Sequence, residues 1–136
     1  MNVLALNCGS SSVKFAAVDF SGGQPPGPSE RRPRGSIERI GGEAICHFVL
    51  SDGPSEEQTC TLPDHESAVH HALAVAASAA PRFDAVGHRV VHGGARFTTT
   101  TLIDPAVLRE IDALSELAPL HNPACVAGIR AARAAC

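Results

Sequence analysis

The first 62 residues alternate between short apolar stretches and polar or glycine-rich turns, a pattern typical of a β-meander. Val3–Leu6 is apolar at every position and predicts a central strand covered on both faces. Gly9–Ser12 supplies turn residues, and Val13–Phe20 predicts a second strand, so the chain is expected to begin with a β-hairpin. Three more short strands are expected at Gly35–Ile40, Ala44–Leu50 and Thr59–Leu62.

The hydrophobic period changes to that of a helix after this meander. Asp64–Ala79 has apolar residues at helical spacing, Asp64 as its N-cap, and Ala80–Pro81 as the pair that ends it. Phe83–His92 returns to the pattern of a strand. Two further helices are expected to begin at Asp104–Pro105 and Asn122–Pro123, where an N-cap residue precedes a proline at the first helical position.

The order of these elements predicts an α/β domain with a mixed sheet that starts with the hairpin and meander and is followed by helices. Residues 21–34 contain four prolines and three glycines and predict a loop. The last helix reaches residue 136 without a stop signal in its final seven residues. We therefore expect residues 1–136 to form the amino-terminal part of something larger.

Composition narrows the classes of function. The 136 residues include 11 Lys and Arg against 14 Asp and Glu, a formal net charge of −3, which disfavours a nucleic-acid binder. No apolar run reaches the roughly 18–20 residues that span a bilayer, and the amino terminus lacks a secretion signal, so a cytoplasmic protein without membrane partners is expected. The five cysteines have no CxxC spacing and are expected to be reduced thiols, neither a disulfide framework nor a zinc site.

The turn of the amino-terminal hairpin gathers polar groups that suit a phosphate. Ser10, Ser12 and Lys14 project to one face of an extended strand, because side chains alternate with period two. Gly9 permits a tight turn that aims backbone N–H groups at a ligand, and Asn7 can contact a phosphate or a hydrated Mg²⁺ through its side-chain oxygen. Lys14 is the only lysine in the chain. A polar hairpin turn without a ligand is the alternative.

Residues 87–94 carry a second candidate site on the last predicted strand. Arg89 and Val91 share one strand face, so a guanidinium stands beside an apolar patch, an arrangement that suits a small carboxylic acid. Gly93–Gly94 allows a ligand to approach the backbone closely. His88 and His92 share the other face but stand roughly 13 Å apart along a strand, too far to chelate one metal ion simply. A structural salt bridge of Arg89 is the alternative.

His121 is the third candidate, because it precedes Asn122, the expected N-cap of the last helix. A helix amino terminus favours anions, and a histidine there can donate a hydrogen bond to a transferring phosphoryl group. A surface histidine in a loop is the alternative. The other cysteine and histidine side chains weighed for a site lack a partner spacing and are expected to be structural: Cys8, His47, His65, His70 and His71.

Taken together, these motifs resemble the acetate kinase family. The resemblance rests on N-C-G-S-S-S-V-K-F at 7–15, H-R-V-V-H-G-G at 88–94 and A-P-L-H-N-P at 118–123, in this order. G-S-I-E-R-I-G at 35–41 and D-H-E-S-A-V at 64–69 are similar to two further stretches of that family. The resemblance implies an actin-like (ASKHA, ribonuclease H-like) fold. It also implies a reversible phosphoryl transfer from ATP to acetate, giving acetyl phosphate and ADP, with Mg²⁺ or Mn²⁺ as the cofactor.

The resemblance also implies a role for each matching residue. Arg89 would bind the carboxylate and the transition state, and His121 would lie near the phosphate, which makes these two the catalytic residues. Val91 and Leu120 would line the apolar pocket for the methyl group. The residues implied to bind the phosphates of ATP are Asn7, which is also the implied metal contact, Ser10, Ser12 and Lys14.

Chains of this family continue far beyond residue 136, and the part beyond it includes the carboxy-terminal nucleotide-binding domain. Because phosphoryl transfer depends on positioning and on neutralising charge around the γ-phosphate, this chain alone is expected to be inactive. The full-length protein is expected to be a homodimer. A propionate or butyrate kinase is an alternative, since one methylene changes discrimination by only ~1–3 kcal/mol. A non-catalytic phosphate-binding remnant is another.

Overall fold

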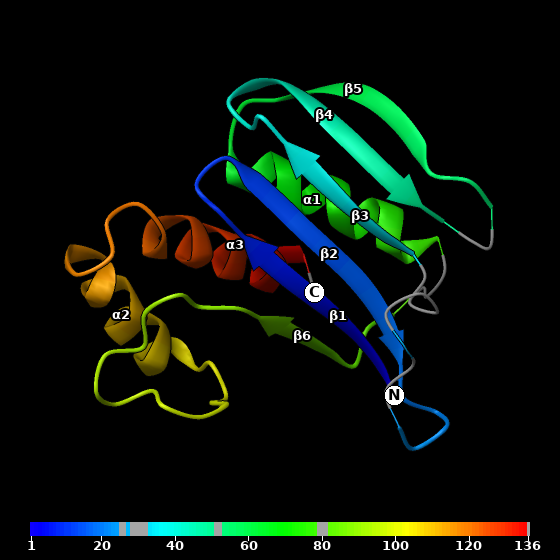
Figure 1. The fold of residues 1–136 in the computed structure, drawn as a ribbon. Coiled ribbons are helices and arrows are strands. Elements are labelled where there is room, and N and C mark those ends of the chain that lie inside the picture. Colours follow the sequence, from blue (N-terminus) through cyan, green and yellow to red (C-terminus); the bar gives the residue numbers. More distant parts are fainter. Residues whose placement is uncertain (25–26, 28–32, 51–52, 79–81, 136) are drawn as a thin grey trace.

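The computed structural model describes residues 1–24, 27, 33–50, 53–78 and 82–135. Within these ranges six strands form one mixed sheet in the order β5-β4-β3-β2-β1-β6 (Figure 1). The strands are β1 (Asn2–Cys8), β2 (Ser12–Asp19), β3 (Arg34–Glu38), β4 (Gly42–Val49), β5 (Glu56–Leu62) and β6 (Ala85–His88). The helices are α1 (His65–Ala77), α2 (Pro105–Ala113), which a short 3-10 helix extends over Leu114–Glu116, and α3 (Asn122–Ala135).

The first five strands form the expected antiparallel meander, in which each strand pairs with the next one along the chain. After α1, β6 joins the other side of β1 and runs parallel to it. The α/β class and the mixed sheet that begins with a hairpin are therefore confirmed. The sequence placed the start of β5 three residues late, because Glu56 and Glu57 are exposed and carry no apolar pattern.

Helices α1 and α3 pack on each other and on one face of the sheet (Figure 1). Leu4 and Leu6 of β1 and Val13 and Phe15 of β2 point to that face and are buried. Ala5, between the two leucines, is exposed on the opposite face. In the described part of the chain β1 is thus covered on one face only, and the expectation of two covered faces was wrong. An alanine leaves little apolar surface in water, so a wholly apolar run does not require a second layer.

All three helices begin where the sequence predicted, and two of the three predicted N-caps are confirmed. The Asp64 carboxylate accepts a hydrogen bond from the Ser67 N–H at 2.8 Å, and the Ser67 hydroxyl closes a capping box at the start of α1. Asp104 caps α2. Asn122, expected as the N-cap of α3, is instead its first helical residue, and its side chain bonds elsewhere. The predicted end of α1 at residues 79–81 lies outside the described residues.

The strand expected over 83–92 is shorter, because β6 ends at His88. The alternation of exposure continues past that point, with Val90 half-buried between the exposed Arg89 and Val91. The chain then turns, and the Phe97 N–H donates to the Gly93 carbonyl oxygen at 3.0 Å. The prediction from sequence periodicity alone therefore included residues of the following loop in the strand.

Two other expectations concern segments that fall partly or wholly outside this description. Of the loop at 21–34, the described residues are 21–24, 27, 33 and 34, and residue 136, the last cysteine, is not described. Over the described ranges, every helix is too short or too polar to cross a bilayer.

Candidate active site

Two of the predicted site residues, Asn7 and Arg89, come directly after the last residue pair that joins β1 to β6. β1 and β6 run parallel, and Leu6 is the register partner of His88. The Arg89 N–H donates to the Leu6 carbonyl oxygen at 3.0 Å. Asn7 and Arg89 therefore lie side by side, one residue further along each strand, at the same end of the sheet. Their separation in sequence gives no sign of this pairing.

The β1–β2 hairpin brings the phosphate-type residues to the same end. Asn7 is the register partner of Lys14, and the face they share is the one that the helices leave open. The Gly9 N–H closes the turn by donating to the Ser12 carbonyl oxygen at 2.8 Å. Ser10 is exposed in this turn and Ser12 is half-buried at the start of β2. Amide, hydroxyl and ammonium groups thus cluster beside Arg89.

His65 holds this turn from the helix side, a contact that sequence reasoning missed. It is the first residue of α1, and its Nε2 lies 2.6 Å from the Gly9 carbonyl oxygen. Because a carbonyl oxygen only accepts, this Nε2 carries the proton. The N-cap at Asp64, which was recognised, fixes where α1 begins and so places His65. The expected structural role of His65 thus includes positioning the serine-lined turn.

The start of α3 lies at this end of the sheet as well (Figure 1). Asn122 is fully buried, and its Oδ1 accepts from the His92 N–H at 3.1 Å while its Nδ2 donates to the His92 carbonyl oxygen at 3.0 Å. This pair of bonds ties the loop that follows Arg89 to the first turn of α3. His121, one residue before that helix, is exposed beside the same loop.

Arg89, Lys14 and His121 are exposed, and in the described part of the chain none of their side chains forms an ion pair or a hydrogen bond. By contrast, Arg96 and Arg130 pair with carboxylates of α2. The structural salt bridge considered for Arg89 is therefore missing within the described ranges. Cations left without acidic partners at one end of a sheet attract an anion.

Val91 and Leu120, the residues implied to hold the methyl group, present apolar surface to solvent. Val91 is 41% exposed and Leu120 is 74% exposed. They flank the charged groups but do not enclose a pocket. Covering them with a ligand or with another part of a longer protein would gain the free energy of burying apolar surface.

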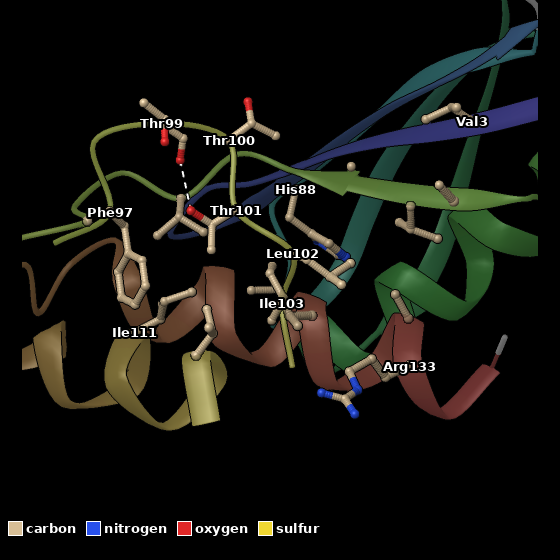
Figure 2. Close-up of a pocket in the computed structure, with 18 residues that line it drawn as sticks. Val3, His88, Phe97, Thr99, Thr100, Thr101, Leu102, Ile103, Ile111 and Arg133 are labelled. Carbon is tan, nitrogen blue, oxygen red and sulfur yellow. Dashed lines mark hydrogen bonds between the residues drawn. The ribbon is translucent and has the colours of Figure 1, made fainter. Parts of the chain in front are cut away.

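The cavity of about 840 Å³ lies elsewhere, along the outer edge of β6, where no described strand pairs (Figure 2). Its lining comes from β6, the loop at 97–103, α2 and α3, and is mainly apolar. None of the predicted phosphate- or acid-binding residues lines it. His88 points into it, and burial lowers the pKa of His88 to about 4, so the imidazole is neutral at pH 7. The one charged side chain in the lining is that of Arg133, so the groove brings together none of the phosphate-binding groups that the predicted chemistry needs.

The glycine pair after β6 serves the turn of the chain itself. A Cβ on Gly93 would lie 2.3 Å from the Phe97 carbonyl oxygen, and Gly94 has a positive φ of +62°. The Gly94 N–H donates to Nδ1 of His92 at 3.0 Å. The glycines were expected to make room for a ligand. In the structure, the group that approaches Gly93 closely is the backbone of Phe97.

The donor groups at the sheet end suit phosphate oxygens. Hydroxyls of Ser10 and Ser12 and the ammonium of Lys14 donate, while the amide oxygen of Asn7 is a hard neutral ligand of the kind that Mg²⁺ accepts beside water and phosphate oxygens. Cys8, next to Asn7, is not a nucleophile at neutral pH, because burial raises the pKa of its thiol to about 12. The arrangement thus suits the binding and orientation of anions, and the buried Cys8 thiol is not available for covalent catalysis.

The sequence is similar to that of known proteins over nearly its whole length. The sequence model of the acetokinase family matches residues 2–136. The acetate kinase of Streptomyces coelicolor is 44% identical over 142 residues, which cover 97% of this chain and 33% of the relative. Acetate kinase 2 of Listeria monocytogenes is 43% identical, over 96% of this chain and 32% of the relative.

Solved structures give the same result for the fold. The acetate kinase of Porphyromonas gingivalis superposes with a TM-score of 0.82 at 33% identity, over 96% of this chain and 33% of that one. A propionate kinase of Francisella tularensis superposes with a TM-score of 0.78 at 33% identity, over the same shares. The chain thus spans about a third of the length of the relatives it matches. Its fold is the expected actin-like domain shared with these kinases.

Proposed function

This chain belongs to the acetokinase family over residues 2–136, and from that premise we propose that it supplies the acid- and phosphate-binding wall of an ATP-dependent carboxylate kinase. The proposed reaction of the full-length protein is the reversible transfer of a phosphoryl group from ATP to acetate, giving acetyl phosphate and ADP. The remaining two-thirds of a relative's length would supply the nucleotide-binding domain, so the chain alone would not turn over.

One observation carries the proposal: Asn7 lies between two cations, on neighbouring strands, that have no ion-pair partner among the described residues. Lys14 is its register partner on β2, and Arg89 follows the Leu6–His88 pair on β6. An anion held there would contact a cation on each side and the amide between them. A structural role alone would favour carboxylate partners, as Arg96 and Arg130 have.

The acid side of the reaction rests on four residues. Acetate is ionised at pH 7, so one of its oxygens can attack the γ-phosphorus in line without a general base, while the bond to the bridging oxygen of ADP breaks. Arg89 would grip the carboxylate with its planar fork, and Val91 and Leu120 would face the methyl group. His121 would donate a hydrogen bond to an oxygen of the transferring group as charge builds there.

The phosphate side rests on the hairpin. Ser10, Ser12 and Lys14 would bind phosphate oxygens and offset their charge. Asn7 would offer its oxygen to a divalent cation shared with the phosphates, and such a cation, when bound, lowers the electrostatic barrier to attack. His65 would act as a positioning residue, because it fixes the Gly9 carbonyl and with it the turn.

A chimera tests this function directly. Residues 2–136 would replace the matching third of the Streptomyces coelicolor acetate kinase, and acyl phosphate would be trapped as hydroxamate. We expect product from acetate with the chimera and none with the isolated chain. Arg89→Ala should lower the rate by about 100-fold or more, as loss of one transition-state donor does. Arg82→Ala, an exposed arginine before the opposite end of β6, is the matched control and should leave the rate unchanged.

A folded chimera without activity would support the alternative of a non-catalytic remnant, and an active Arg89→Ala chimera would remove that residue from the mechanism. Propionate and butyrate in the same assay would decide the acid. One neighbour in structure is named a propionate kinase, and Val91 and Leu120 are both exposed to solvent. The same family membership supports a homodimeric, cytoplasmic full-length protein, which sedimentation and cell fractionation would test.

A further inference from the structure

Three metal-ligating side chains meet at the end of the molecule remote from β6, between the outer strands and α1. The ligand atoms of Cys46, Cys60 and His71 all lie within 4.8 Å of one another. They come from β4, β5 and α1, respectively. In the described ranges no other group of three or more such side chains comes this close. The proposed kinase chemistry does not use any of them.

Strand register explains how the two thiols meet. Cys46 pairs with Gln58, and Ala44 pairs with Cys60, so the cysteines are diagonal neighbours on the face that α1 covers. His71 reaches them from the helix, and its ring packs against Phe48 with centroids 5.5 Å apart. The absence of CxxC spacing in the sequence led us to expect no zinc site, but pairing of strands replaces sequence proximity here.

The separation of two of the ligand atoms matches that in a tetrahedral metal site, and the third lies within 4.8 Å of both. With Zn–S of about 2.3 Å and Zn–N of about 2.0 Å, a tetrahedral centre holds its sulfur and nitrogen ligands about 3.5 Å apart and two sulfurs about 3.8 Å apart. The Cys60 Sγ lies 3.7 Å from the His71 Nε2. Cys60 and His71 therefore already stand at the spacing of two ligands of one ion, and Cys46 would have to approach to a similar spacing from within 4.8 Å.

Burial and the fourth position also fit a metal. Cys46 is fully buried and Cys60 and His71 are half-buried, so the site excludes most water but has an entrance. Gln58 stands at that entrance, with its Nε2 3.3 Å from the His71 Nε2. Its amide can turn to offer oxygen, or a water can take the place, as in three-ligand zinc sites.

We propose that Cys46, Cys60 and His71 form a binding site for one Zn²⁺ ion, which joins the outer strands of the sheet to α1. Thiolate and imidazole ligands together select zinc over the hard cations used in phosphoryl transfer. In the metal-free chain burial raises the pKa of the Cys46 thiol to about 12, so binding the ion releases protons. A disulfide fits less well, since diagonal neighbours stand about 7–8 Å apart and a disulfide needs about 4.4–6.8 Å between Cα atoms.

Titration of the reduced chain with Co²⁺ tests the site, because a tetrahedral cobalt–thiolate centre absorbs in the visible and near-ultraviolet. We expect saturation at one Co²⁺ per chain and loss of the bands when Zn²⁺ is added. Cys60→Ser and His71→Ala should abolish the bands. His70→Ala, the exposed neighbour on α1, and Cys125→Ala, a cysteine outside the cluster, should retain them. Circular dichroism would check that each variant is folded.

A second readout separates binding at this cluster from binding elsewhere. Zn²⁺ should raise the Tm of the wild-type chain and of His70→Ala, and leave the Tm of His71→Ala unchanged. Absence of cobalt bands, or bands of full intensity in both Cys60→Ser and His71→Ala, would overturn the proposal. Neither result depends on kinase activity, so the metal site and the proposed reaction can fail separately.

Discussion

Asn122 is the residue on which the arrangement of the candidate site depends most, and its replacement by alanine should cost measurable stability. Its side chain is fully buried and makes two hydrogen bonds to the backbone of His92. A net hydrogen bond contributes about 0.5–1.5 kcal/mol, so losing both costs roughly 1–3 kcal/mol. Asn122→Ala should therefore lower the free energy of unfolding by about 2 kcal/mol, near the middle of that range.

Urea unfolding followed by circular dichroism measures this change. With a slope of about 2 kcal/mol per molar urea, the midpoint should fall by about 1 M at an unchanged slope. Asn2→Ala is the matched control. Within the described ranges the side-chain amide of Asn2 has no hydrogen-bond partner, and its backbone N–H, which donates to Asp84, is kept in the variant. This variant should stay within about 0.5 kcal/mol of wild type. Equal midpoints for Asn122→Ala and Asn2→Ala would refute the reasoning that Asn122 holds the loop to α3.

Three further changes probe the rest of the domain. Gly128→Ala would place a Cβ 2.3 Å from the Cys8 Sγ and should lower the free energy of unfolding by about 1–3 kcal/mol. Cys8→Ala in the same chain should restore most of this loss. If the effects of the two single substitutions, measured by urea unfolding, simply add in the double variant, the clash is not the cause. The low pKa of His88 means that, as the pH is lowered, the unfolded chain takes up a proton near pH 6.5 and the folded chain only near 4. The free energy of unfolding should therefore decrease as the pH falls from 6.5 to 4, and His88→Asn should make this pH dependence weaker. Asp104→Ala should cost about 1 kcal/mol through loss of the α2 cap and Asp104→Asn much less; equal losses in thermal unfolding would count against capping.

Local rules recovered the elements that depend on neighbouring residues. The period-two pattern and the turn at Gly9–Ser12 predicted the hairpin, and Asp64 and Asp104 predicted two helix starts. Such features need no knowledge of the remainder of the fold, because the residues that make the contact lie within a few positions of each other. The strand predicted through His92 shows the limit, since periodicity persists where the backbone has already turned.

Contacts between distant segments could not be predicted in this way. Arg89 and Val91 were expected to share a strand face, yet what places Arg89 beside Asn7 is the register of β6 against β1. Asn122 is a residue type that often caps helices. Its two hydrogen bonds to the His92 backbone, made in a buried site, contribute more stability than one hydrogen bond to its own helix would. The same holds for the two thiols that β4 and β5 bring together. Sequence spacing contains no information on such pairs.

The two cations at this end of the sheet do not stabilise the fold, so their placement is better explained by the binding of an anion. Lys14 and Arg89 lie two strand spacings apart, about 10 Å, so their repulsion is only about 0.4 kcal/mol in water. An anion midway between them, about 5 Å from each, would gain about 0.8 kcal/mol per pair of unit charges, more when water is excluded. The groove beside β6 has a volume of about 840 Å³, but its lining is mainly apolar and it lacks a pair of cations with an amide between them. Unpaired charge, more than cavity volume, therefore locates the candidate site in this domain.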